Sequence, residues 1–166
     1  MCSKMSNENG QTLMELIVVI LISVLVIGAL VFATIASLRN AQFAKNQAQA
    51  TKLAQEGLER VKVIRERDEV GKIVYTIPPG ANQFSDLWGI TLTCPDNCYF
   101  VFDASGRLSS TVASAFEQIA SSDHRRQVTL EDGSDGQFEK KVTIIVEWTD
   151  HAGDHQSRLE SILSRL

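Results

Sequence analysis

The chain has 166 residues and a formal net charge of −4. Lysine and arginine are scattered along it without a cluster, so the sequence carries no electrostatic footprint for nucleic acid. Once residues 1–38 are set aside, the remainder is long enough for one long helix and one compact domain, and too short for two large domains.

An uncharged apolar run lies between Glu15 and Arg39. Leu16–Leu38 contains 23 residues without a charge. A helix rises about 1.5 Å per residue and a bilayer core needs about 20 apolar residues, so the run predicts a membrane-spanning helix. The run is too long for the core of a secretory signal. An uncleaved signal anchor explains the hydrophobicity but gives no reason for an acid at the start of the span.

Glu15 also has a purely structural interpretation. Thr12-Leu13-Met14-Glu15 reads as a Ser/Thr-x-x-Glu capping box, in which the acid satisfies backbone N–H groups at the start of a helix. An acid at that end also meets the positive end of the helix macrodipole. Capping and a functional role for Glu15 are compatible.

The sequence Gly10-Gln11-Thr12-Leu13-Met14-Glu15, with the apolar run behind it, resembles the N-terminus of type IV prepilins. In that family a membrane peptidase cuts after the leader glycine and methylates the new amino group. The resemblance implies cleavage after Gly10, N-methylation of Gln11, and pairing of Glu15 with the terminal amine of a neighbouring subunit. A free α-amine has a reference pKa of about 7.7 to 8.0, so it is mostly protonated at neutral pH. In an apolar filament core, this ammonium and the Glu15 carboxylate would each be costly to bury without the other.

Two departures from the family pattern bear on the kind of pilin. Mature pilins commonly begin with an aromatic residue, and Gln11 is not aromatic. The span contains Gly28 but lacks the proline that major pilins often carry. Both departures favour a minor pilin or a pseudopilin.

Residues 39–69 are predicted to continue the helix of residues 11–38, because they contain no proline and are rich in strong helix formers. Apolar residues recur at helical spacing, which predicts a stripe that packs against another surface. The stripe consists of Ala41, Ala44, Ala48, Ala54, Leu58, Val61 and Ile64. Its alanine-rich first half suits close helix approach, and its larger second half suits the underside of a sheet. A stalk that does not self-associate is the alternative.

Residues 70–98 read as a connecting loop with a short strand at Ile73–Ile77. Cys94 and Cys98 flank the turn-forming Pro-Asp-Asn, while the third cysteine, Cys2, lies in the predicted leader of residues 1–10. We expect a disulfide between Cys94 and Cys98. Two free thiols are the alternative. The spacing does not match a CxxC redox motif, and no further zinc ligands lie nearby, so neither a redox motif nor a zinc site is expected.

Residues 99–166 are predicted to form an antiparallel β domain. Strands are expected at 99–102, 127–130 and 140–149, and residues 155–166 fit either a strand or a short helix. The expected fold is α+β: a long N-terminal helix, membrane-spanning in its first half, packed on a small antiparallel sheet of about four strands, as in the lollipop fold of pilins. Lys141–Asp150 before a glycine turn resembles, loosely, the end of minor pilins with a PilV-type domain.

Neither metal chemistry nor catalysis is predicted. His151 and His155 flank a turn with two aspartates, a pattern more typical of solvated turn residues than of metal ligands. The acidic stretch 131–136 offers oxygen ligands for calcium but lacks the spacing of an EF-hand loop. No Ser, His and Asp set stands out. We therefore expect no cofactor and no enzyme activity.

Together these patterns predict a structural subunit, a minor pilin or pseudopilin of a type IV pilus or a type II secretion-like filament. The resemblance implies as partners a prepilin peptidase, other pilin subunits, and an assembly platform with its motor. It places the chain in the cytoplasmic membrane as a single-pass protein with a cytoplasmic N-terminus, and after assembly in an extracellular or periplasmic filament. The alternative is an uncleaved, single-span, membrane-anchored extracellular binding module.

Overall fold

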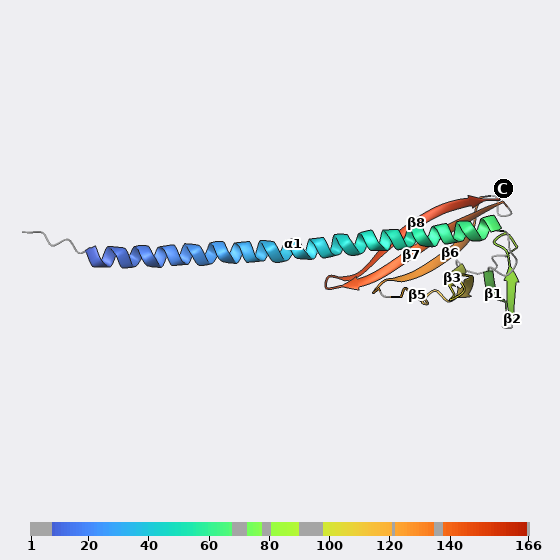
Figure 1. The fold of residues 1–166 in the computed structure, drawn as a ribbon, viewed down its shortest axis with the longest axis horizontal. Coiled ribbons are helices and arrows are strands. Elements are labelled where there is room, and N and C mark those ends of the chain that lie inside the picture. The colour runs from blue at the N-terminus through green and yellow to red at the C-terminus, as the bar shows by residue number, and fades with distance from the viewer. Residues whose placement is uncertain are drawn as a thin grey trace, which may run out of the picture. The chain divides into compact units, whose positions relative to one another are not determined.

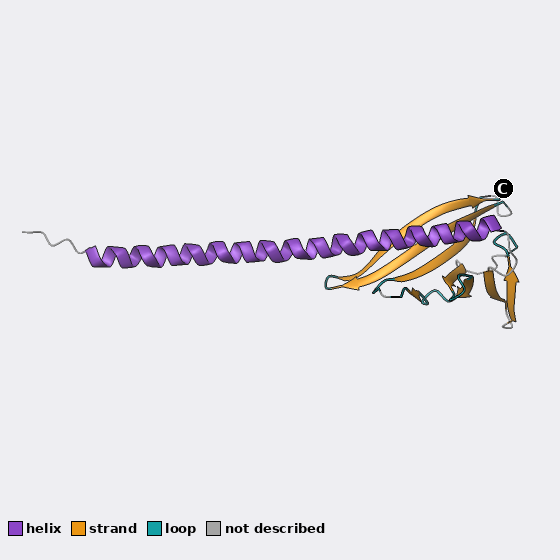
Figure 2. Cartoon of the chain, viewed as in Figure 1, coloured by secondary structure: helices purple, strands orange, loops and turns teal. Residues whose placement is uncertain are grey.

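A computed structural model describes residues 8–67, 73–77, 81–89, 98–120, 122–134 and 138–165. The chain divides into two compact units, Met1–Ala44 and Lys45–Leu166. One helix, α1 (Glu8–Arg67), runs through the boundary, and every strand belongs to the second unit (Figures 1 and 2).

Helix α1 is 60 residues long, which confirms the prediction that the apolar segment and the following polar segment form one helix. No proline interrupts it, and Gly28 does not break it. The hydroxyl groups inside the apolar segment bond within the helix: Ser23 Oγ donates to the Val19 carbonyl (2.7 Å) and Thr34 Oγ1 to the Leu30 carbonyl (2.8 Å). These bonds satisfy hydroxyls that would otherwise be costly in an apolar environment.

The second unit contains one mixed sheet. Its strands are β1 (Ile73–Ile77), β2 (Ala81–Ser85), β3 (Cys98–Phe102), β4 (Leu108–Thr111), β5 (Glu117–Gln118), β6 (Arg125–Asp132), β7 (Glu139–Asp150) and β8 (Gly153–Ser164). The path runs β2-β1-β4-β3-β6-β7-β8, and β5 pairs with β6 off that path. The α+β prediction is confirmed, but the expectation of about four antiparallel strands is corrected: the sheet is larger, and β1 pairs with β4 in parallel.

The three longest strands form an antiparallel meander. β6 pairs with β7 from Arg125↔Glu147 to Asp132↔Lys140, and β7 pairs with β8 from Glu139↔Ser164 to Asp150↔Gly153. The ambiguous C-terminal stretch is therefore a strand. The tight turn before it contains Gly153 at φ 124°, a backbone conformation that favours glycine. In Figure 1 the C-terminal part of α1 lies across β6, β7 and β8.

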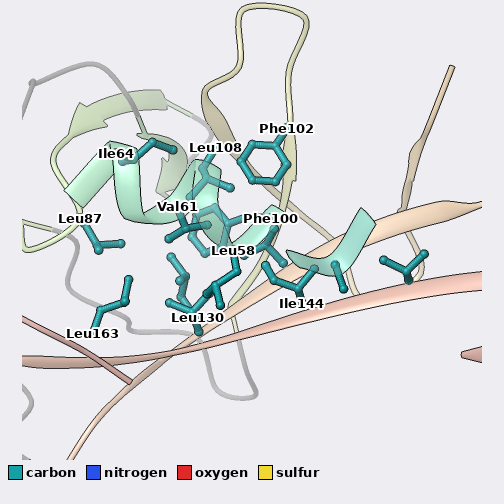
Figure 3. Close-up of a cluster of buried hydrophobic side chains, with 14 of the residues drawn as sticks. Leu58, Val61, Ile64, Leu87, Phe100, Phe102, Leu108, Leu130, Ile144 and Leu163 are labelled. Atoms are coloured by element: carbon teal, nitrogen blue, oxygen red, sulfur yellow. The ribbon is translucent and has the colours of Figure 1, made fainter. Parts of the chain in front are cut away.

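The core forms where one face of α1 meets the sheet. Leu58, Val61 and Ile64 are buried, as predicted, and in Figure 3 they lie among side chains from β3, β6 and β7. The helix stripe that is buried consists of Ala50, Ala54, Gly57, Leu58, Val61 and Ile64. Ala41, Ala44 and Ala48 are exposed, so the close approach of another helix to the first half of the stripe stays a prediction. Among the described side chains of α1, Ala50 is the first that is fully buried.

Candidate functional site

The predicted processing segment lies at the start of α1. Gly10 and Gln11 are helical, and Glu15 is exposed one helical turn further on. The side chains of residues 8–12 lie outside the described part of the chain, so cleavage after Gly10 and methylation of Gln11 stay predictions. The capping-box interpretation is wrong for the helix as the structure describes it, because α1 begins at Glu8 and Thr12 is inside the helix.

The apolar segment of the first unit is exposed on all sides. α1 contains a window of 18 residues with a mean hydropathy of 3.3, and none of that window is buried within the protein. The exposed large apolar residues of this segment begin at Leu13 and end at Leu38. Contiguous apolar surface of this size is unfavourable in water. The helix is therefore long and apolar enough to cross a membrane, which is compatible with a membrane anchor.

The second unit has an open groove of about 530 Å³ between α1 and the segment that leads into β6. Its lining comes from α1, from residues around His124, and from Trp148 and Thr149 of β7. His124 Nε2 lies 3.2 Å from the Asn46 carbonyl of α1. The lining residues are Lys45, Asn46, Gln49, Lys52, Leu53, Glu56, Ile119, Ala120, Ser122, Asp123, His124, Trp148 and Thr149.

His155, near the last turn, serves local structure. His155 stacks on Trp148 with ring centroids 5.4 Å apart, and its Nε2 lies 3.0 Å from Asp150 Oδ1. The Ala152 N–H and His155 hold the pKa of the Asp150 carboxyl below its usual value, despite an opposing effect of burial. Asp150 thus closes the turn. Within the described ranges, no three His, Cys, Asp or Glu side chains come together as a metal site.

The acidic stretch after β6 is partly described. Asp132 pairs with Lys140 across the β6–β7 ladder, and Ser134 Oγ donates to Glu139 Oε2 (2.8 Å). Residues 135–137 lie outside the described residues. Asp132 and Ser134, which could have served as cation ligands, are thus engaged by other side chains.

A buried ion pair, which the sequence reasoning missed, joins the sheet to its flank. Arg126 on β6 is 2% exposed, and it binds Glu117 on β5 through Nε (3.1 Å) and Nη2 (3.0 Å). Its Nη1 donates to the Leu53 carbonyl of α1 (3.3 Å), and its guanidinium lies over the Phe102 ring. In the sequence, the only sign of this pair is that Arg126 stands at an inward-facing strand position and that Glu117 precedes it by nine residues.

Cys98 opens β3, is buried, and is disulfide-bonded. Cys94 lies outside the described residues, so its assignment as the partner of Cys98 stays a prediction.

Comparison with known proteins gives no relative: no family model, no curated protein and no solved structure matches this chain. The fold itself defines the class. It is an α+β protein with a long N-terminal helix, apolar in its first part and packed on a sheet in its second, and this architecture is pilin-like.

Proposed function

We propose that this chain is a structural subunit, a minor pilin or pseudopilin, of a type IV pilus or a type II secretion-like filament. The observation that carries the proposal is the exposed apolar helix with Glu15 as its first acid after Gly10, continuous with a helix that packs on a sheet. An anchor needs the apolar length alone. A filament subunit also needs a polar group that fixes its position among its neighbours.

The proposed role of Glu15 follows from charge burial. Cleavage after Gly10 would leave a positively charged amine at Gln11, four residues before Glu15. Among closely packed apolar helices, an unpaired carboxylate is costly, and so is an unpaired ammonium. Pairing Glu15 of one subunit with the terminal amine of the next would remove both costs and would fix the axial register.

The membrane would hold the subunits before assembly. The apolar helix would sit in the cytoplasmic membrane with the N-terminus in the cytoplasm, where the prepilin peptidase would remove residues 1–10. A separate platform and motor would extract the processed subunit into the filament. The proposed Cys94–Cys98 disulfide fits an exterior, oxidising location of the second unit.

The alternative function is a membrane-anchored binding module, and one observation favours it. The groove beside His124 is large enough for a small ligand or a short peptide and is lined mainly by polar side chains. A module of this kind would need neither cleavage nor Glu15.

The substitution Glu15→Ala separates the two functions. For a filament subunit, the variant should stay in the membrane, fold normally and fail to enter sheared filaments. An anchored module should be unaffected in location and ligand binding. Glu8→Ala is the matched control, because it removes an acid from the predicted leader. Normal incorporation of Glu15→Ala into filaments would refute the proposed role.

A further inference from the structure

The residue that cleavage would expose at the start of the mature chain is a glutamine. Cleavage after Gly10 makes Gln11 the first residue, and this inference rests on that proposed cleavage. Since α1 runs from Glu8 to Arg67, the mature chain begins inside this helix. The first N–H groups of a helix have no partner within the helix. The backbone hydrogen bonds of α1 therefore do not hold the new amine.

The new amine would be the only cation in the apolar part of α1. Residues 11–38 contain no lysine, arginine or histidine, and Glu15 is their only acid. Glu15 is exposed, one helical turn after Gln11. A reaction that removes the positive charge at Gln11 therefore leaves Glu15 without a cationic partner in this segment, both in its own chain and in a neighbouring copy.

A glutamine at the start of a chain can react with itself. The neutral α-amine has a lone pair, and its attack on Cδ of the glutamine side chain closes an unstrained five-membered lactam. The new N–Cδ bond replaces the bond from Cδ to the amide nitrogen, and that nitrogen takes up the proton of the amine and leaves as ammonia. No oxidant or other reactant takes part. With a reference pKa of about 7.7 to 8.0, roughly a tenth of such an amine is neutral at pH 7.

We propose that Gln11 of the processed chain is a modification site, at which the terminal amine cyclises onto its own side chain and gives a neutral pyroglutamyl terminus. A methyl group leaves the nitrogen its lone pair, so the methylated chain reacts in the same way. The lactam nitrogen carries no positive charge, and burial of an ionised Glu15 then costs free energy that no cation offsets. Cyclised subunits are thus excluded from the proposed filament.

Glu15 slows the reaction that would leave it unpaired. A carboxylate near the amine favours the protonated amine, which has no lone pair and does not attack. Glu15 stands four residues after Gln11, a spacing that brings two groups to the same side of a helix. In the proposed filament, Glu15 of a neighbour protects the amine further. Cyclisation therefore concerns subunits that wait in the membrane.

The mass of the full chain in detergent tests the reaction. The chain is purified from membranes with an active peptidase, incubated at mildly alkaline pH and sampled over time. Its N-terminal peptide should lose the mass of one ammonia, and its terminus should stop reacting with phenyl isothiocyanate, which needs a free amine. Gln11→Asn is the matched control. It keeps a side-chain amide, but its lactam ring would have only four members, so its terminus should stay reactive.

The substitution Glu15→Gln tests the protection. It should speed the loss of ammonia by about twofold, as expected when one exposed charge pair at this helical spacing is removed. Glu56→Gln, in the second unit, is the control and should leave the rate unchanged. In pulse-labelled cells, cyclised chains should accumulate in the membrane and be absent from sheared filaments. An equal rate in Glu15→Gln and in the unchanged chain would refute the protective role.

The outcomes separate this proposal from the proposed function. If the chain still begins at Met1 while the peptidase is active, cleavage, cyclisation and the filament assignment fail together. If it begins at Gln11 but keeps its ammonia and its reactive amine, the cyclisation proposal is wrong and the filament proposal stands. Equal fractions of cyclised chain in filaments and membranes would show that a neutral terminus does not prevent assembly.

Discussion

Gly57 of α1 lies directly against Arg126 of β6. A Cβ at position 57 would be 3.1 Å from Arg126 Cδ and 3.2 Å from Ile144 Cγ2. The absence of a side chain lets the helix approach the sheet at the point where the guanidinium turns toward Glu117. This contact joins the long helix to the sheet.

Gly57→Leu should destabilise the second unit by about 1–3 kcal/mol, because the added side chain overpacks a close contact. Gly57→Ala should change stability by less than about 1 kcal/mol, since the better helix propensity of alanine offsets the tight contact. Chemical denaturation of the full chain in detergent measures both. Ala48→Leu, on an exposed position of the same helix, is the matched control and should be neutral.

Glu117→Gln should destabilise the second unit by about 3 kcal/mol, because it leaves the buried Arg126 charge without its carboxylate. The double variant Glu117→Gln/Arg126→Met should be less damaging than the two single effects combined, since it removes both charges. A double-mutant cycle measures this coupling. The exposed Glu56–Arg60 pair provides the control, with an expected coupling below about 1 kcal/mol. Equal coupling in the two cycles would contradict the role given to the buried pair.

Gln127→Leu should release the segment between β4 and β5. The buried Gln127 Nε2 lies 2.6 Å from the Ala115 carbonyl and 3.1 Å from the Ala113 carbonyl. Leaving these carbonyls without a donor costs about 1–3 kcal/mol. Hydrogen exchange in residues 112–118 should accelerate in this variant. Gln118→Leu removes a single exposed hydrogen bond and should leave that exchange unchanged.

The turn between β3 and β4 should weaken in acid. Burial of the Asp103 carboxyl raises its pKa, but hydrogen bonds from Arg107 and from the Ser105 N–H outweigh burial and hold the pKa below its usual value. The folded pKa is thus lower than the unfolded value of about 3.9. The ionised carboxylate therefore stabilises the turn above that value, and the stabilisation is lost as the pH falls through the folded pKa.

Asp103→Asn should flatten this acid dependence. Thermal unfolding between pH 7 and pH 2.5 measures it, and Asp123→Asn, the same change at an exposed loop position, is the control. An unchanged pH profile in Asp103→Asn would show that the turn does not respond to Asp103.

The long helix and its packed end could be predicted from the sequence, because an unbroken run of helix formers and the spacing of Leu58, Val61 and Ile64 are local signals. The burial of Ala50 could not be predicted. Alanine occurs at both exposed and buried helix positions, and the burial of Ala50 depends on where the sheet begins.

The size of the sheet could not be predicted, because its additional strands depend on distant partners. β4 is short and mostly polar, and its pairing with β1 is parallel and joins segments far apart in the sequence. Arg126 was missed for a related reason. A buried arginine is acceptable only where Glu117, the Leu53 carbonyl and Phe102 surround it, and these belong to three separate elements.

The intact mass of the protein purified from membranes tests the proposed function most directly. With an active prepilin peptidase, we predict a chain that begins at Gln11, carries one added methyl group, and lacks two hydrogens because Cys94 and Cys98 are joined. Without the peptidase, the chain should begin at Met1. A chain that retains residues 1–10 while the peptidase processes its other substrates would contradict the assignment as a pilin-like subunit and would favour a membrane-anchored module.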